Sequence, residues 1–335
     1  MAKGTGAEKV ANATEYPIYA IALGLLGNLA VTLAGIRDRI AAAFRTEFFI
    51  KTGLVLLGAS INLAVIVRAA GPAIAQSVLL ISTVFLFTWW LGGRFGLDDL
   101  LRALLSAAVS ICGVSAAIAA AGAVRARREQ LAYTASLVIV FALPSIFILP
   151  WLVDVFGLGH AVAGAWIGGN IDTTAAVTAA GALVGEQSLQ VATIVKITQN
   201  ALMGLVALAL TAWFALRIEP RQGVAPGQRV TLPGAGELWR RFPKFVLGFL
   251  VASAIATWYL ETAGSGGKDV IATVTALRIW FLILAFVSIG LEFRVASLRE
   301  AGWRPIGVFA SATVVNLVVG LALAALLFHN FNVSG

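Results

Sequence analysis

One apolar stretch contains a short polar motif, VKITQN at residues 195–200, whose side chains could bind and exchange ions. In a helix, Lys196, Gln199 and Asn200 would share one face because they are spaced at i, i+3 and i+4. Thr198 lies within the same motif. A lysine buried in apolar surroundings needs a carboxylate or an anionic ligand as its partner. We therefore expect Lys196 to balance the charge of a bound anion, and Thr198, Gln199 and Asn200 to help bind a coupling ion.

Two glycine-containing motifs could bind ligands through their backbone. SICGVS at 110–115 provides Ser110, Cys112, Gly113 and Ser115, and GGNIDTT at 168–174 provides Gly169, Asn170, Asp172, Thr173 and Thr174. A helix that resumes after such a tip presents unpaired N–H groups and the positive end of its dipole, which together hold an anion. Asp172 could bind the coupling ion, or it could cap the helix that follows it.

The composition predicts that these motifs lie inside a membrane. Of 335 residues, 60% are hydrophobic and 12% charged, and the mean hydropathy is +0.93, which excludes a soluble enzyme. A single cysteine excludes an internal disulfide framework, and His160 and His329 lack the spacing of metal ligands, so we expect neither a metal nor another cofactor. The net charge of +8 comes from Lys and Arg in short connections, which indicates membrane topology and not nucleic-acid binding.

Ten apolar segments recur along the chain. They cover residues 17–36, 48–67, 73–93, 103–124, 130–153, 160–184, 189–216, 245–261, 270–291 and 305–328. We divide the chain into a polar segment (1–16), a first repeat with part of the second (17–216), a cytoplasmic linker (217–244), the remaining helices (245–328) and a tail (329–335). Residues 1–16 lack the apolar core of a signal peptide, so we expect the first helix to be retained.

Internal similarities suggest a duplicated, inverted architecture. SAAIAAAGAV from residue 115 and TAAVTAAGAL from residue 174 share six of ten positions, and the region from Leu56 resembles the region from Phe286. The two pairs fit one symmetry operation only if 103–124 and 160–184 are re-entrant hairpins that do not cross. Discontinuous helices that break at the midplane are the alternative.

The distribution of positive charge favours the hairpins. With the beginning of the chain outside, the hairpin topology places 17 Lys and Arg residues inside and four outside, whereas ten full crossings give 14 and seven. Other polar residues in the segments are expected mainly to form interhelical hydrogen bonds or to snorkel to the surface: Asn28, Lys51, Thr52, Asn62, Ser311, Thr313 and Asn316. We expect Glu292 to pair with Arg294 at the surface.

Four blocks of sequence carry a resemblance to a known family. They are KTGLVLLGASINLAVI (51–66), SICGVSAAIAAAGAV (110–124), AWIGGNIDTTAAVTAAG (165–181) and ATIVKIT (192–198). They resemble the sulfate exporter family of YeiH-like bacterial inner-membrane proteins over residues 17–328. The resemblance implies kinship with bile-acid/sodium symporters and cation/proton antiporters, in which a mobile core with broken helices moves against a scaffold in an elevator mechanism.

Two positions depart from that family pattern. Members carry a histidine before the aspartate and an arginine after the Lys-x-Thr, whereas this chain has Ile171 and Gln199. The loss of two cations weakens the case for sulfate and leaves sulfonates, carboxylates and other small organic anions open. Gln199 and Asn200 are similar to the Gln-Asn pair of bile-acid symporters, where such a segment helps bind sodium.

Together these observations predict an all-α polytopic membrane protein that is not an enzyme. We expect a secondary transporter of a small anion, coupled to H+ or Na+, with a core (73–216 and 305–328) that moves against a scaffold (17–67 and 245–291). The resemblance implies that the scaffold also forms a homodimer in the bacterial inner membrane. The alternatives are an uncoupled anion channel, which would use the same tips as weak sites in series, and a subunit of a membrane enzyme.

Overall fold

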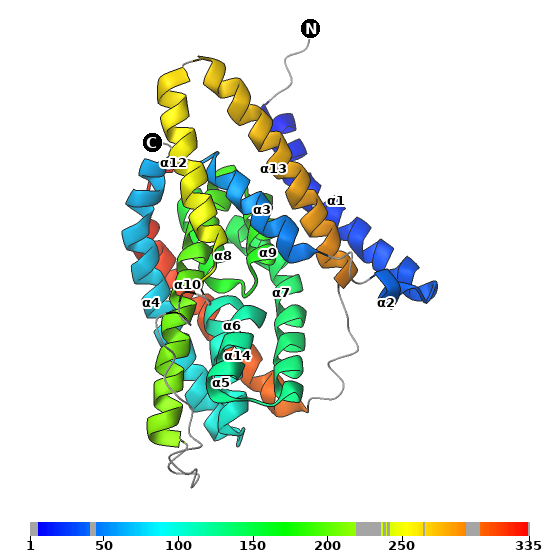
Figure 1. The fold of residues 1–335 in the computed structure, drawn as a ribbon, viewed down its shortest axis with the longest axis vertical. Coiled ribbons are helices and arrows are strands. Elements are labelled where there is room, and N and C mark those ends of the chain that lie inside the picture. Colours follow the sequence, from blue (N-terminus) through cyan, green and yellow to red (C-terminus); the bar gives the residue numbers. More distant parts are fainter. Residues whose placement is uncertain are drawn as a thin grey trace.

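A computed structural model describes residues 6–40, 45–218, 236, 239, 242–263, 265–292 and 302–333 (Figure 1). These residues form helices and connections, without a strand. The helices are α1 (Gly6–Leu33), α2 (Arg37–Ile40), α3 (Thr46–Gly58), α4 (Leu63–Arg94), α5 (Asp99–Ala107), α6 (Val114–Val124), α7 (Arg128–Phe156), α8 (His160–Asn170), α9 (Thr174–Val184), α10 (Glu186–Trp213), α12 (Phe245–Ala263), α13 (Ser265–Glu292) and α14 (Trp303–Phe328), with π-helical turns η2 (Ala108–Cys112) and η3 (Phe214–Ile218).

Seven of the helices in the described part of the chain are long and apolar enough to cross a membrane. These candidate spans are Tyr16–Leu33, Leu63–Arg94, Arg128–Phe156, Glu186–Ile218, Phe245–Thr262, Asp269–Glu292 and Trp303–Phe328. They correspond to seven of the ten expected segments. The all-helical, multi-spanning prediction is confirmed.

The expected boundary between the second and third segments is wrong. The expected segments 48–67 and 73–93 leave a connection that contains Gly71 and Pro72, but α4 runs through both, and the chain unwinds earlier, over residues 59–62. Side chains form hydrogen bonds with the backbone groups near this unwound stretch. Asn62 caps α4 by accepting a hydrogen bond from Ala64 N (2.8 Å), and Ser253 of α12 donates to the carbonyl of Ile61 (2.6 Å). With 13 residues, α3 is shorter than the roughly 20 residues that a crossing requires.

The start of the first helix differs from expectation, and most of the linker lies outside the described residues. Helix α1 already begins at Gly6, inside the segment 1–16 that we expected to be separate from the first helix. Most of the linker 217–244 lies outside the described residues, as does Arg294, the expected partner of Glu292.

The helices form two groups (Figure 1). In one group, α1 and α3 pack against α13, and α12 packs against α3; this group corresponds to the expected scaffold. In the other, α4 to α10 pack with α14 and correspond to the expected core. Between the groups, α9 contacts α1, α3 and α13, and α12 contacts α4. The site described below lies between these two groups.

Both short helix pairs in the core are hairpins whose two ends lie side by side. For α5 and α6, the Gln130 amide donates to the carboxylate of Asp98 at 2.9 and 3.0 Å, which joins the entry of the hairpin to its exit. For α8 and α9, the hydroxyl of Ser188 donates to the carbonyl of His160 (3.0 Å). Two halves of a broken crossing would end far apart, so this geometry favours the hairpin interpretation.

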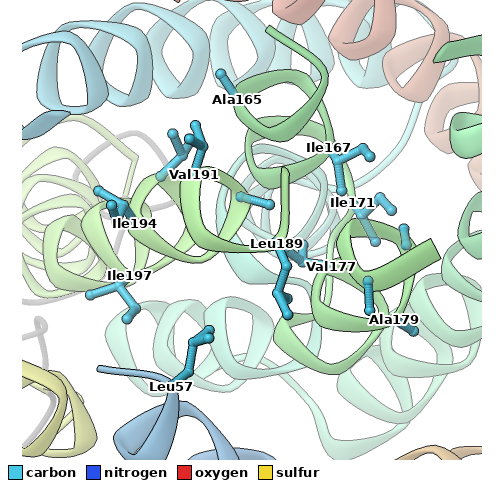
Figure 2. Close-up of a cluster of buried hydrophobic side chains, with 14 of the residues drawn as sticks. Leu57, Ala165, Ile167, Ile171, Val177, Ala179, Leu189, Val191, Ile194 and Ile197 are labelled. Atoms are coloured by element: carbon cyan, nitrogen blue, oxygen red, sulfur yellow. The ribbon is translucent and has the colours of Figure 1, made fainter. Parts of the chain in front are cut away.

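The hairpin α8–α9 is held on α10 by small residues and branched apolar side chains (Figure 2). A Cβ atom on Gly168 would lie 2.5 Å from the carbonyl oxygen of Ala192, so only glycine allows α8 to approach α10 this closely. Ile167, Val177 and Val191 belong to the same cluster of buried hydrophobic side chains. The apolar packing fixes the register between the hairpin and the polar face of α10.

One ion pair ties the scaffold to the core. Arg278 of α13 is 3% exposed, and its guanidinium donates to both carboxylate oxygens of Glu186, at the start of α10, at 2.7 and 3.0 Å. We expect Glu186→Gln to destabilise the protein by about 2 kcal/mol, because it leaves a buried cation without its counter-ion. Thermal unfolding would measure the loss. Glu47→Gln, which breaks the exposed Lys51–Glu47 pair, is the control and should have almost no effect; equal losses in the two variants would contradict the interpretation.

Candidate functional site

A cavity of about 700 Å³ lies between the scaffold and the two hairpins of the core. Helix α7 contributes an apolar wall that includes Ile139 and Ile146, while the starts of α6 and α9 contribute Ser115 and Thr174. The volume is within the range of ordinary small-molecule sites. The cavity therefore brings the beginnings of two separate helices to one space.

The first tip is a tight reversal at Gly113. Its backbone has φ 59° and ψ −118°, and its N–H closes the π-helical turn by donating to the carbonyl of Ala108 (3.0 Å). Helix α6 begins immediately afterwards without a side-chain cap, and Val114 and Ser115 line the cavity. Since the first N–H groups of a helix have no intrahelical acceptor, this end can donate to a ligand.

The second tip is an extended stretch between α8 and α9. Thr173 caps α9 by accepting a hydrogen bond from Ala176 N (3.2 Å), so the alternative in which Asp172 acts as the cap is wrong. Thr173, Thr174 and Ala175 line the cavity. Asp172 is 6% exposed and lies against the first tip, where a Cβ on Gly113 would be 3.0 Å from the Asp172 carbonyl oxygen.

A third element, α14, connects the tips. The side-chain amide of Asn316 donates to the carbonyl of Val109 (3.1 Å) and to the carbonyl of Asn170 (3.2 Å). Asn316 was expected to form interhelical hydrogen bonds, and this prediction is confirmed, as is that for Asn28, which donates to the carbonyl of Gly290 (3.1 Å). One buried amide thus fixes the two tips relative to each other.

Lys196 lies behind the cavity wall and not among the lining residues. Its ammonium donates to the carbonyl of Ile111 (2.6 Å) and to Oε1 of Gln199 (2.9 Å). The Gln199 amide in turn donates to the carbonyl of Gly169 (3.0 Å). Lys196 and Gln199 therefore link the first tip to the second through α10.

Asn200 is the member of the polar motif that reaches the cavity. Its Nδ2 donates to the hydroxyl oxygen of Thr174 (3.2 Å), while its Oδ1 is buried without a hydrogen-bond partner in the described part of the chain. This bond joins α10 to the start of α9 at the edge of the cavity.

The remaining expected site residues lie at different distances from the cavity. Cys112 lines it, with its sulfur 3.6 Å from that of Met203. The hydroxyls of Ser110 and Thr198 bond to carbonyls of their own helices, at 2.6 and 2.8 Å, and neither residue lines the cavity. Gly169 and Asn170 lie behind the second tip, where the Asn170 amide donates to the carbonyl of Trp166 (2.7 Å).

Sequence reasoning missed the scaffold side of the cavity. Glu47, Lys51, Lys244 and Glu292 contribute charges of both signs there, and the Lys51 ammonium lies 2.6 Å from the Glu47 carboxylate. For Lys51 the sequence favoured snorkelling to the surface over a functional role. No local pattern indicates that α3 and α12 face the hairpin tips, because their position depends on tertiary packing.

The described residues thus form a multi-pass α-helical membrane protein with a cavity at two helix breaks. Residues 2–309 match the model of the family described as Conserved hypothetical protein 698, and the chain belongs to that family. It is 36% identical over 323 residues to the UPF0324 membrane protein RB9488 of Rhodopirellula baltica, covering 94% of this chain and 58% of that protein.

Further relatives occur in Nitratidesulfovibrio vulgaris. One UPF0324 membrane protein of this bacterium is 35% identical over 316 residues, covering 91% of this chain and 53% of the relative. Another UPF0324 membrane protein of the same bacterium is 33% identical over 322 residues, covering 93% of this chain and 86% of the relative. The chain spans a little over half the length of the first two relatives. No solved structure matches the chain. A location in the inner membrane fits the bacterial sources of these membrane proteins.

Proposed function

We propose that this protein is a secondary transporter that carries a small anion across the bacterial inner membrane by alternating access. The observation that carries the proposal is the convergence of two helix N-termini, those of α6 and α9, on one cavity inside the helical bundle. A helix break in a membrane leaves polar backbone groups that need protein, water or a ligand as partner. Two such breaks facing one cavity make a site for negative charge.

The polar groups at this site suit a small anion. Backbone N–H groups at the starts of α6 and α9 and the hydroxyls of Ser115 and Thr174 can all donate, and Asn200 adds its amide. Asp172 and Lys196 lie just behind these groups and not in contact with the anion. Their proposed role is to respond to the coupling ion and to hold the tips in place.

The packing behind the tips supports a carrier in preference to the uncoupled channel. Trp166 and Ile171 are 2% and 1% exposed, and Ala165 is fully buried. A channel would need a wet path through this region, whereas a carrier exposes one side at a time. The two helix groups meet at the cavity, and movement of the core against the scaffold would expose the tips on the other side.

Thermal unfolding of the purified protein against a panel of anions tests the proposal, because a ligand that binds only the folded state raises the midpoint. The panel contains sulfate, methanesulfonate, and mono- and dicarboxylates, each as sodium and potassium salts at two pH values. An anion that raises the midpoint should then show saturable uptake and counterflow in liposomes. Uptake without saturation or counterflow would identify a channel, and no stabilisation by any of these anions would count against the anion site.

A further inference from the structure

The carbonyl ends of the two hairpins' first arms are linked through one buried ammonium group and one amide. Lys196 is 1% exposed, and its Nζ donates to the carbonyl oxygen of Ile111, near the end of η2, at 2.6 Å. The Oε1 atom of Gln199 lies 2.9 Å from the same nitrogen, and the Gln199 amide extends the link to the carbonyl of Gly169 near the end of α8. The ammonium thus contacts the first arm directly and reaches the second arm through Gln199.

The position of this charge is one at which a dissolved cation would bind. The C-terminal end of a helix carries partial negative charge, and in transporters with broken helices such ends coordinate Na+ or H+. A backbone carbonyl and an amide oxygen are also the hard ligands that such ions prefer. Here the ammonium of Lys196 already takes both oxygens.

We propose that Lys196 is a built-in cation that replaces Na+ at the junction of the two tips, so that the protein works without bound sodium. The expected use of Gln199 in a sodium site is then excluded, because its oxygen already accepts from Lys196. For transport, the inference rests on the proposed function: the ion exchanged at this junction is the proton of Lys196, and a pH gradient drives the anion.

Two ionisable groups act on Lys196 from the elements packed against this part of α10. The α8–α9 connection contributes Asp172, and η2 contributes Cys112. Asp172 is the acid that can balance the ammonium while it is protonated, and loss of the Lys196 proton would replace the charge-assisted bond to the carbonyl of Ile111 by a weaker neutral one. Because Ile111 precedes the Gly113 reversal, this weakening acts directly on the tip that lines the anion cavity.

Cation-dependent thermal unfolding tests the inference on the purified full chain without any substrate anion. Wild-type protein should have the same midpoint in sodium, potassium and choline chloride at equal ionic strength. Lys196→Ala should lower the midpoint by about 5 °C or more, because two buried oxygens lose their partner. Propylammonium, which matches the deleted atoms from Cγ to Nζ, should restore at least half of this loss, and Na+ should restore part of it, while tetramethylammonium should not.

The control is Lys51→Ala, which removes an equal charge from an exposed lysine paired with Glu47. It should neither lower the midpoint nor create a response to propylammonium. Selective stabilisation of the wild type by Na+ would overturn the inference, as would a Lys196→Ala protein that is as stable as wild type or indifferent to propylammonium. If Lys196→Ala does not fold, the wild-type comparison decides alone. Since no readout uses an anion, failure of the proposed transport would leave these results interpretable.

Discussion

Alanine in place of Gly113 is expected to lower the thermal midpoint strongly and to abolish anion binding. Only glycine adopts φ 59° and ψ −118° without strain, which costs another residue about 1–3 kcal/mol. The added Cβ would also lie 2.5 Å from Cγ1 of Val138 and 3.0 Å from the carbonyl oxygen of Asp172. The two tips must therefore separate, and we expect a total cost of about 4 kcal/mol.

Thermal unfolding and anion-dependent stabilisation measure the two parts of this prediction. Gly157→Ala is the matched control, because Gly157 also has a positive φ of 61° but an added Cβ would meet nothing within 4 Å. It should cost about 1 kcal/mol and leave anion binding unchanged. The role assigned to Gly113 is refuted if the two variants lose the same stability and retain the same anion response.

The positions of the helix breaks could be predicted from sequence because local residue types determine them. SICGVS and GGNIDTT interrupt alanine-rich apolar runs, and the structure breaks the chain at Gly113 and between Asn170 and Thr174. The break before α4 was missed because Gly71 and Pro72 form a stronger turn signal than Asn62. The cap at Asn62 and the bond from Ser253 of a distant helix decide this boundary, and the second of these is invisible in local sequence.

The sequence correctly predicted that three polar side chains share one face of α10. It did not predict which groups each of them contacts. The spacing of Lys196, Gln199 and Asn200 put them together on α10. Whether they point into a cavity or toward the back of a hairpin depends on how α8 packs on α10. The close contact at Gly168 fixes that packing, so that Gln199 reaches Gly169 and Asn200 reaches Thr174.

The shape of the cavity also depends on tertiary packing, which the local sequence does not determine. Two tips could be expected to meet, since an inverted arrangement brings them to the midplane, and the structure places Gly113 against Asp172. The wall opposite the tips comes from helices whose sequence is simply apolar with scattered charges. Lys51 and Glu292 line the cavity because α3 and α13 pack together there. No sequence motif predicts this packing.

Asn200→Asp is expected to weaken anion binding strongly while leaving the fold intact. The substitution keeps size and shape, and an aspartate oxygen can still accept from the hydroxyl of Thr174, now 3.2 Å from the Asn200 amide. A carboxylate at this buried position repels an anion at the N-termini of α6 and α9, and we expect affinity to fall at least about 100-fold, or about 3 kcal/mol. Titration of the most stabilising anion by thermal shift and by uptake would measure the loss.

Two further variants decide whether the effect of Asn200→Asp is electrostatic and local. Asn200→Ala removes a single donor without adding charge and should weaken binding only about 10-fold. Asn62→Asp makes the same change at an exposed helix cap, where aspartate serves as well as asparagine, and should leave both stability and anion binding unchanged. If Asn200→Asp bound the anion as tightly as wild type, the ligand would lie elsewhere, because a negative charge next to Thr174 repels an anion bound at the start of α9.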